Sequence, residues 1–376
     1  MIYADYNATT PCLPEVADLM RQALLEDFGN PSNRATVLGR SARAHVDTAR
    51  ERISKAIGAR SDEVIFTSGA TEACNLAIFG VVERCLAPRP TILYSAVEHP
   101  AVLEPLKHCD NAGAQLEKIA VDAQGQIDLA TFKTQLSREV GLVCIMLANN
   151  ETGICQEQMS RLVDAARGAG AMVFCDATQV LGKLELNLES LGVDFAALSA
   201  HKCYGPKGVG ALWKRKGLAI SPQIRGGGQE AGLRSGTENV AGIAGFGLAA
   251  EIAHRELATH QAHLQAMQNQ LETTLLDALP GLQIHGLKTK RIPGTSMLTL
   301  PGLGRGWLTQ LREVAASSGS SCASGTGKES HVLMAMGLSE KDAGNSIRIS
   351  LGRMTTSDEV DIIAERLIDG ANRLRD

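Results

Sequence analysis

The sequence has few aromatic residues, little excess charge and no long apolar run. Aromatic residues make up 3% of the 376 residues, which disfavours base-stacking surfaces for nucleic acid. Thirty-seven basic and 41 acidic residues give a net charge of −4, which argues against a broad basic surface. No apolar run reaches the ~18 residues of a membrane span, and residues 1–6 lack the basic and apolar segments of a signal peptide. We therefore expect a soluble cytoplasmic protein with no membrane partner and no direct contact with nucleic acid.

The spacing of the cysteines also shows no metal-binding or disulfide motif. None of the nine forms a C-x-x-C pair, so neither a disulfide framework nor a structural zinc site is predicted, and we expect no metal site. Most of them suit small buried positions. Cys322 is the exception, because it lies in the Ser/Gly-rich tract 315–327. A thiol in such a flexible, exposed tract is a candidate nucleophile, and the alternative is a linker with an incidental cysteine.

Short apolar runs alternate with helical patterns through the middle of the chain. Continuous runs of this length are typical of strands buried on both faces of a mostly parallel sheet, and they occupy residues 64–67, 91–94, 141–147, 171–175 and 195–198. Residues 241–278 have the pattern of one long helix. We predict an α/β protein with a large domain at 13–255 and a smaller α+β domain formed by 1–12 and 256–376.

Three polar clusters follow apolar runs, where strands of such a sheet bind ligands. The segment Ser68–Glu72 opens a helix, so its backbone N–H groups and the Thr71 hydroxyl could bind phosphate; the alternative is an ordinary helix N-cap. Asp176 could pair with a buried cation or cap the next helix. Lys202 could be a desolvated amine that acts as a nucleophile, or a lysine that extends to solvent.

Together these clusters supply what pyridoxal 5′-phosphate (PLP) needs. A lysine holds the aldehyde, a carboxylate keeps the ring nitrogen protonated and a helix end binds the phosphate. His99, in Glu98-His99-Pro100, could cover the ring or be a solvated loop residue. Arg348, with Arg353 as a second candidate, could bind the carboxylate of an amino acid or form a structural ion pair.

With these residues in place, the chain resembles the cysteine desulfurases, the NifS/IscS-like group of class V aminotransferases. The shared motifs run nearly end to end and lie at 4–11, 29–32, 67–72, 98–100, 149–153, 176–179, 199–202, 226–230, 234–239, 318–322 and 346–353. The Cys322 tract separates this group from ordinary aminotransferases. The resemblance implies the aspartate aminotransferase-like fold of PLP-dependent transferases, with the Cys322 loop in the small domain.

The resemblance also implies roles for individual residues. Lys202 would form the Schiff base with PLP and later move protons, and His99 would stack on the ring and serve in acid–base catalysis. The other implied cofactor-binding residues are Ala70, Thr71, Asn150, Asp176, Gln179, Ser199, His201 and Thr237. Among them Asp176 would pair with the pyridinium nitrogen, Gln179 would bond the phenolic oxygen, and Thr71, Ser199 and His201 would hold the phosphate.

The implied reaction converts L-cysteine to L-alanine. Asn150 and Arg348 would position the substrate, and Cys322 would take its sulfur as a persulfide for transfer to an acceptor protein. Thr237 would reach the phosphate in the partner subunit of a homodimer. Iron–sulfur cluster assembly, tRNA thiolation and DNA phosphorothioation are all open as destinations of the sulfur. A related PLP-dependent lyase or aminotransferase, and a non-catalytic sulfur-relay subunit, are the alternative functions, and Cys203 could be a second reactive thiol or a packing residue.

Overall fold

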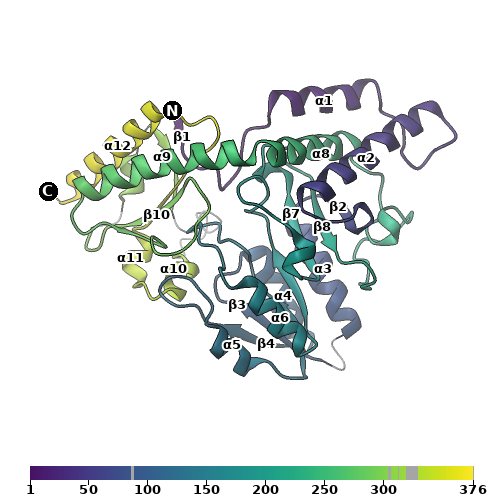
Figure 1. Cartoon of the computed structure of the whole chain (residues 1–376), viewed down its shortest axis with the longest axis horizontal. Coiled ribbons are helices and arrows are strands. Elements are labelled where there is room, and N and C mark those ends of the chain that lie inside the picture. Colours follow the sequence, from purple (N-terminus) through teal and green to yellow (C-terminus); the bar gives the residue numbers. More distant parts are fainter. Residues whose placement is uncertain (86–88, 304–305, 312, 319–328, 376) are drawn as a thin grey trace.

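A large sheet with helices on both faces and a smaller sheet beside it make up the chain (Figure 1). The computed structural model describes residues 1–85, 89–303, 306–311, 313–318 and 329–375. No helix in these ranges is long and apolar enough to cross a membrane.

The large sheet has seven strands in the order β2-β8-β7-β6-β5-β3-β4. Their bounds are β2 Val64–Thr67, β3 Thr91–Ser95, β4 Gln115–Ile119, β5 Val140–Cys144, β6 Met172–Asp176, β7 Phe195–Ser199 and β8 Gly210–Lys214. Strands β4, β3, β5, β6 and β7 pair in parallel, and β8 runs antiparallel to both of its neighbours. The prediction of a mostly parallel sheet is confirmed. Each of the five predicted runs lies within a few residues of a strand, whereas β4 and β8 were not predicted.

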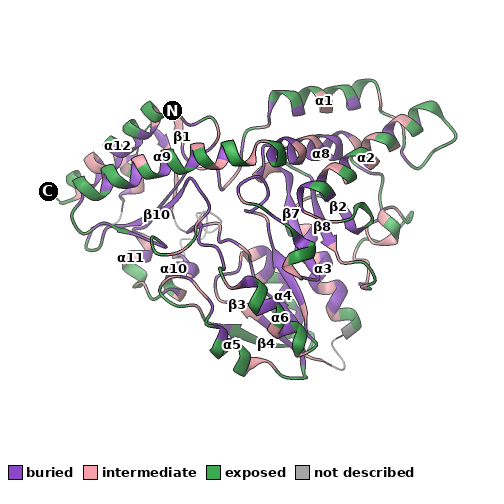
Figure 2. Cartoon of the chain, viewed as in Figure 1, coloured by how far each residue is buried: buried purple, intermediate pink, exposed green. Residues whose placement is uncertain are grey.

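Alternate residues of the central strands enter two separate cores. Val173 and Cys175 of β6 pack in one core, whereas Phe174 between them packs in the other. Figure 2 shows these strands buried beneath their helices. This double burial is the reason that the strands read as continuous apolar runs.

Helices cover both faces of this sheet. The helices whose residues enter the first core include α2 Val37–Ala56, α5 Leu129–Gln135, α6 Met159–Gly168, α7 Leu188–Leu191 and α8 Val240–Arg255. Those of the second core are α3 Ala70–Cys85 and α4 Pro100–Asn111. Helix α1, Pro14–Leu25, packs on α8.

A second, antiparallel sheet has its own core. Its order is β12-β13-β10-β9, with β9 Gln283–Ile284, β10 Thr295–Thr299, β12 Ser317–Ser318 and β13 Ile347–Ser350. A two-stranded parallel ladder joins β1 Ile2–Tyr3 to β11 Val314–Ala315. The helices of this part are α9 Leu257–Ala278, α10 His331–Ala335, α11 Glu340–Gly344 and α12 Ser357–Arg375.

The prediction of one helix over 241–278 is wrong at one residue. Helix α8 ends at Arg255 and α9 begins at Leu257, because the Glu256 backbone turns to φ −101° and ψ 10°. The Glu256 carboxylate pairs there with Arg255 and with Arg353, from the far end of the chain. The break lies beside the predicted domain boundary at residue 255, which stays a prediction.

The first residues of the chain connect the two sheets. Ala4 is buried in the core of the small sheet, and Tyr6 N–H donates to the Ser350 carbonyl of β13. Three residues after Asn7, Thr10 N–H donates to the His201 carbonyl at the end of β7. The N-terminal segment therefore crosses from the small sheet to the carboxyl ends of the large one.

Candidate active site

A cavity of about 500 Å³ lies at the carboxyl ends of β6 and β7. The structure brings most of the predicted site residues to its wall: Ala70, Thr71, His99, Asn150, Asp176, Gln179, Ser199, His201, Lys202 and Arg348. Thr237 does not line it and is exposed on the surface. Cys322 lies outside the described residues.

The first turn of α3 forms one end of the cavity. Glu72 accepts a bond from Ser68 N–H at 2.7 Å and pairs with Arg234 Nε at 2.8 Å. The guanidinium offsets the carboxylate that the first turn would otherwise present to an anion. Gly210 of β8 lets this loop pack closely, because a Cβ there would meet Gly69 Cα at 2.7 Å. The exposed N–H groups of this turn are therefore suited to a phosphate group.

Asp176 and Lys202, at the ends of neighbouring strands, present a carboxylate and an amine to the cavity. Asp176, the last residue of β6, is 6% exposed, and its Oδ1 accepts from Thr178 N–H at 2.9 Å. Lys202 ends a short 3₁₀ turn, Ala200–Lys202, that directly follows β7. Its Nζ donates to the backbone carbonyls of Asn7 at 2.6 Å and Ala8 at 2.8 Å. The N-terminal segment thus sets the position of this amine.

The two histidines of the site are neutral near pH 7. His99 is the N-cap of α4, and its Nδ1 accepts from Ala101 N–H at 3.0 Å, so the ring proton lies on Nε2. Burial lowers the pKa of His99. Burial, with the charges of Lys202 and Lys207, lowers the pKa of His201 to about 4.

Arg348 of β13 is a buried guanidinium that lines the cavity. It is 1% exposed, and it pairs with Asp5 Oδ1 at 2.5 Å and donates to the Asn150 carbonyl at 2.9 Å. Its Nε has no hydrogen-bond partner among the described residues. The structural ion pair and a carboxylate-binding role are therefore compatible with each other.

Sequence reasoning gave Asn7 no role, although the residue lies within the motif at 4–11. Its side chain is buried and donates to Thr295 Oγ1 at 3.0 Å, and its N–H donates to Ser350 Oγ at 3.0 Å. Its carbonyl accepts from Gln179 Nε2 at 3.0 Å as well as from Lys202. The available signal was its place in the motif, between Tyr6 and Ala8.

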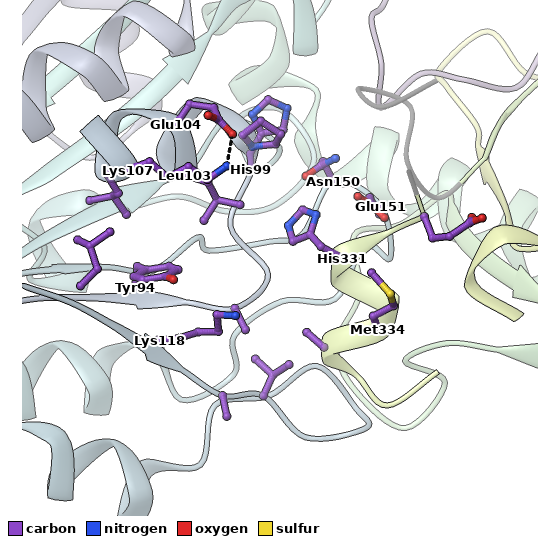
Figure 3. Close-up of a pocket in the computed structure, with 18 residues that line it drawn as sticks. Tyr94, His99, Leu103, Glu104, Lys107, Lys118, Asn150, Glu151, His331 and Met334 are labelled. Carbon is purple, nitrogen blue, oxygen red and sulfur yellow. Dashed lines mark hydrogen bonds and ion pairs between the residues drawn. The ribbon is translucent and has the colours of Figure 1, made fainter. Parts of the chain in front are cut away.

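A larger cavity of about 840 Å³ adjoins the first and shares His99 and Asn150 with it. Figure 3 shows it between the β3 and β4 side chains Tyr94 and Lys118 and the α10 residues His331 and Met334. His331 Nε2 donates to the Glu98 carbonyl at 2.9 Å, which fixes α10 against the loop that carries His99. Glu329, the first described residue after Cys322, also lines this cavity.

Comparisons with known proteins agree with this geometry. The class-V aminotransferase profile matches residues 2–363. A cysteine desulfurase of Frankia sp. (strain EuIK1) is 42% identical over 392 aligned residues, covering 100% of this chain and 92% of the relative. A solved NifS-like protein superposes with a TM-score of 0.90 at 36% identity, covering 99% of this chain and 100% of that one. The solved structure of SspA in complex with cysteine has a TM-score of 0.83 at 30% identity, covering 95% and 100%.

The buried Arg348–Asp5 pair can be tested by its effect on stability. Asp5→Asn should lower the free energy of unfolding by about 3 kcal/mol, because it leaves a buried guanidinium without its anion. Urea denaturation of the purified protein measures this loss. Asp62→Asn is the matched control, since Asp62 forms exposed pairs with Arg60 and Lys216 and should unfold as the wild type does. Equal midpoints for all three proteins would contradict the interpretation of Arg348.

Proposed function

The chain belongs to the class-V aminotransferase family, within which it is a cysteine desulfurase, and we propose that the cavity at Lys202 and Asp176 binds PLP for this reaction. The single observation that carries the proposal is the convergence of a lysine amine, a strand-end carboxylate and a helix N-terminus on one cavity. The sequence predicted each of these separately.

The residues present fit PLP. Thr178 Oγ1 is buried at the cavity wall and has no partner among the described residues, so it is suited to a polar group of a ligand. Lys202 would anchor the aldehyde, and Asp176 would pair with the ring nitrogen. Thr71, Ser199 and His201 would hold the phosphate, with the N–H groups that begin α3.

The protein's own groups then have distinct tasks. PLP, when bound, withdraws electrons from the substrate and so weakens the bonds at its Cα and Cβ. Lys202 Nζ takes and returns the proton at the substrate Cα. His99, neutral and fixed through Nδ1, covers the site and can supply a proton from Nε2. Gln179 is bonded to the Asn7 carbonyl, so any bond that it makes to the cofactor uses its remaining amide hydrogen.

Arg348 and Asn150 give the site its preference for an amino acid. Arg348 lines the cavity and its buried Nε has no partner among the described residues, which supports this guanidinium as the group that receives the substrate carboxylate. A cysteine-bound relative of the same fold supports L-cysteine as the substrate.

Cys322 is proposed as the sulfur acceptor. In the small sheet, Ser317 of β12 lies opposite Arg348 of β13. Cys322 follows Ser318 by four residues, which span at most about 14 Å, so its thiol is tethered near Arg348. In the net reaction the Cβ–S bond of L-cysteine breaks and an S–S bond forms at Cys322. One thiol proton moves to Cβ and the other stays on the outer sulfur, so the products are L-alanine and a persulfide.

The persulfide is proposed to pass to an acceptor protein, with iron–sulfur assembly, tRNA thiolation and DNA phosphorothioation as its possible destinations. A reducing compartment, the cytoplasm, suits this chemistry and the seven free cysteines among the described residues. Cys203 is suited to packing, because burial raises the pKa of its thiol to about 12.

A homodimer is the proposed assembly. The end of α1, the connection that follows it and the start of α2 (Figure 2) expose large apolar side chains that are 41–73% exposed: Leu24, Leu25, Phe28, Val37 and Leu38. A cluster of apolar side chains of this size is typical of a protein interface. Thr237 is exposed in one subunit, as a residue that serves the partner's site would be.

Cys322→Ala should abolish sulfur transfer. With L-cysteine and a reductant, the variant should form alanine and sulfide at least about 100-fold more slowly than the wild type, because the nucleophile is lost. Alanine is measured by chromatography and sulfide by a colorimetric assay.

Cys203→Ala is the control and should keep the wild-type rate. If Cys322→Ala still forms alanine at the wild-type rate, the enzyme is a lyase that releases the sulfur without this thiol, and if both proteins consume L-cysteine without forming alanine, the enzyme is an aminotransferase. If the wild type forms neither product, the proposed function is wrong.

Phe28→Glu should convert the dimer to a monomer, because a carboxylate would be buried without a partner at the subunit interface. Light scattering after size-exclusion chromatography distinguishes one 39.8 kDa chain from two. Leu276→Glu, an exposed site on α9, should remain dimeric. A monomeric wild type, or a dimeric Phe28→Glu variant, would rule out this interface.

A further inference from the structure

A second lysine, Lys183, is buried behind the amine of Lys202. It is 5% exposed and lies in the turn that follows β6, four residues after Gln179. Its Nζ donates to Gln179 Oε1 at 2.8 Å and to Asn7 Oδ1 at 2.8 Å. Both acceptors are neutral amides, so neither hydrogen bond supplies a negative charge.

Lys183 and Lys202 bind the two ends of the same asparagine. Lys183 donates to the Asn7 side-chain oxygen, and Lys202 donates to the Asn7 backbone carbonyl. Because Lys183 occupies Gln179 Oε1, the Gln179 amide must present its Nε2 to that same carbonyl. The orientation of both amides around Lys202 therefore depends on Lys183.

The surroundings of Lys183 leave its charge unbalanced. Among the described residues, the titratable groups that interact electrostatically with Lys183 are Lys202, Arg348, Cys203, His201 and His260. None of them is a carboxylate, and burial keeps Cys203 a neutral thiol. Burial, together with the charges of Lys202 and Arg348, lowers the pKa of Lys183 to about 7.

We propose that Lys183 is a positioning residue for the reaction: it orients the Asn7 and Gln179 amides around the Lys202 amine and places a second positive charge behind it. A positive neighbour disfavours a proton on Lys202. While Lys183 carries its proton, it therefore favours loss of the proton from the Lys202 nitrogen. This inference rests on the proposed function, since it concerns the lysine that anchors PLP.

The test compares PLP-loaded full-length variants by the absorbance of the bound cofactor between pH 5 and 10. In Lys183→Met and Lys183→Gln, the midpoint of this titration should rise by roughly one pH unit, because the neighbouring charge is gone. Lys183→Arg keeps the charge and should stay near the wild-type midpoint. The pH profile of kcat should move in the same direction as the absorbance.

Lys214→Met is the matched control, because Lys214, the last residue of β8, is a half-buried lysine that does not line the cavity and donates to the Leu218 carbonyl. It should leave the midpoint unchanged. Thermal melting shows whether each variant is folded. If Lys183→Met does not fold, the comparison uses Lys183→Gln, which keeps a hydrogen-bond donor.

Unchanged midpoints in both uncharged variants would overturn the inference and leave the desulfurase function intact, provided that the wild type binds PLP and forms alanine. A merely structural Lys183 would lower the melting temperature without moving the midpoint. A wild type that binds no PLP would overturn both proposals.

Discussion

The active site depends on one buried asparagine in a segment that crosses between the two sheets. Asn7 joins β10 and β13 of the small sheet through Thr295 and Ser350, and its carbonyl accepts from Lys202 at the end of β7. Its hydrogen bond to Ser350 links positions 343 residues apart. Because buried polar groups are costly to leave unpaired, these bonds fix the small sheet, which carries Arg348, relative to the Lys202 amine.

The electrostatics of the site favour anions. Lys183, Lys202 and Arg348 bring positive groups to a buried region, whereas its histidines are held neutral. Burial also raises the pKa of Glu98 well above its usual value and that of Glu151 to about 7, which reduces the negative charge near the adjoining cavity. A phosphate and a substrate carboxylate are therefore attracted to this region with little opposing charge from these acids.

Much of the fold could be read from the sequence because its main sheet is buried on both faces. The runs around Val173 and Ala196 have no other simple interpretation, and Asp176 and Lys202 follow them directly. The break at Glu256 was not predicted, and one of the partners of its carboxylate, Arg353, lies almost 100 positions away in the sequence. Asn7 and Lys183 were missed for the same reason: each has a role only through partners that the fold brings from distant segments. Thr237 and Cys322 stay predictions, since one faces the surface and the other lies outside the described residues.

Lys183 and Lys202 both donate to Asn7, and we assign the cofactor to Lys202. The most direct test is borohydride reduction of the PLP-loaded protein, followed by proteolysis and mass spectrometry of the labelled peptide. We expect a pyridoxyl group on Lys202 and none on Lys183. Label on Lys183, or an unlabelled protein that had been fully loaded with PLP, would contradict it.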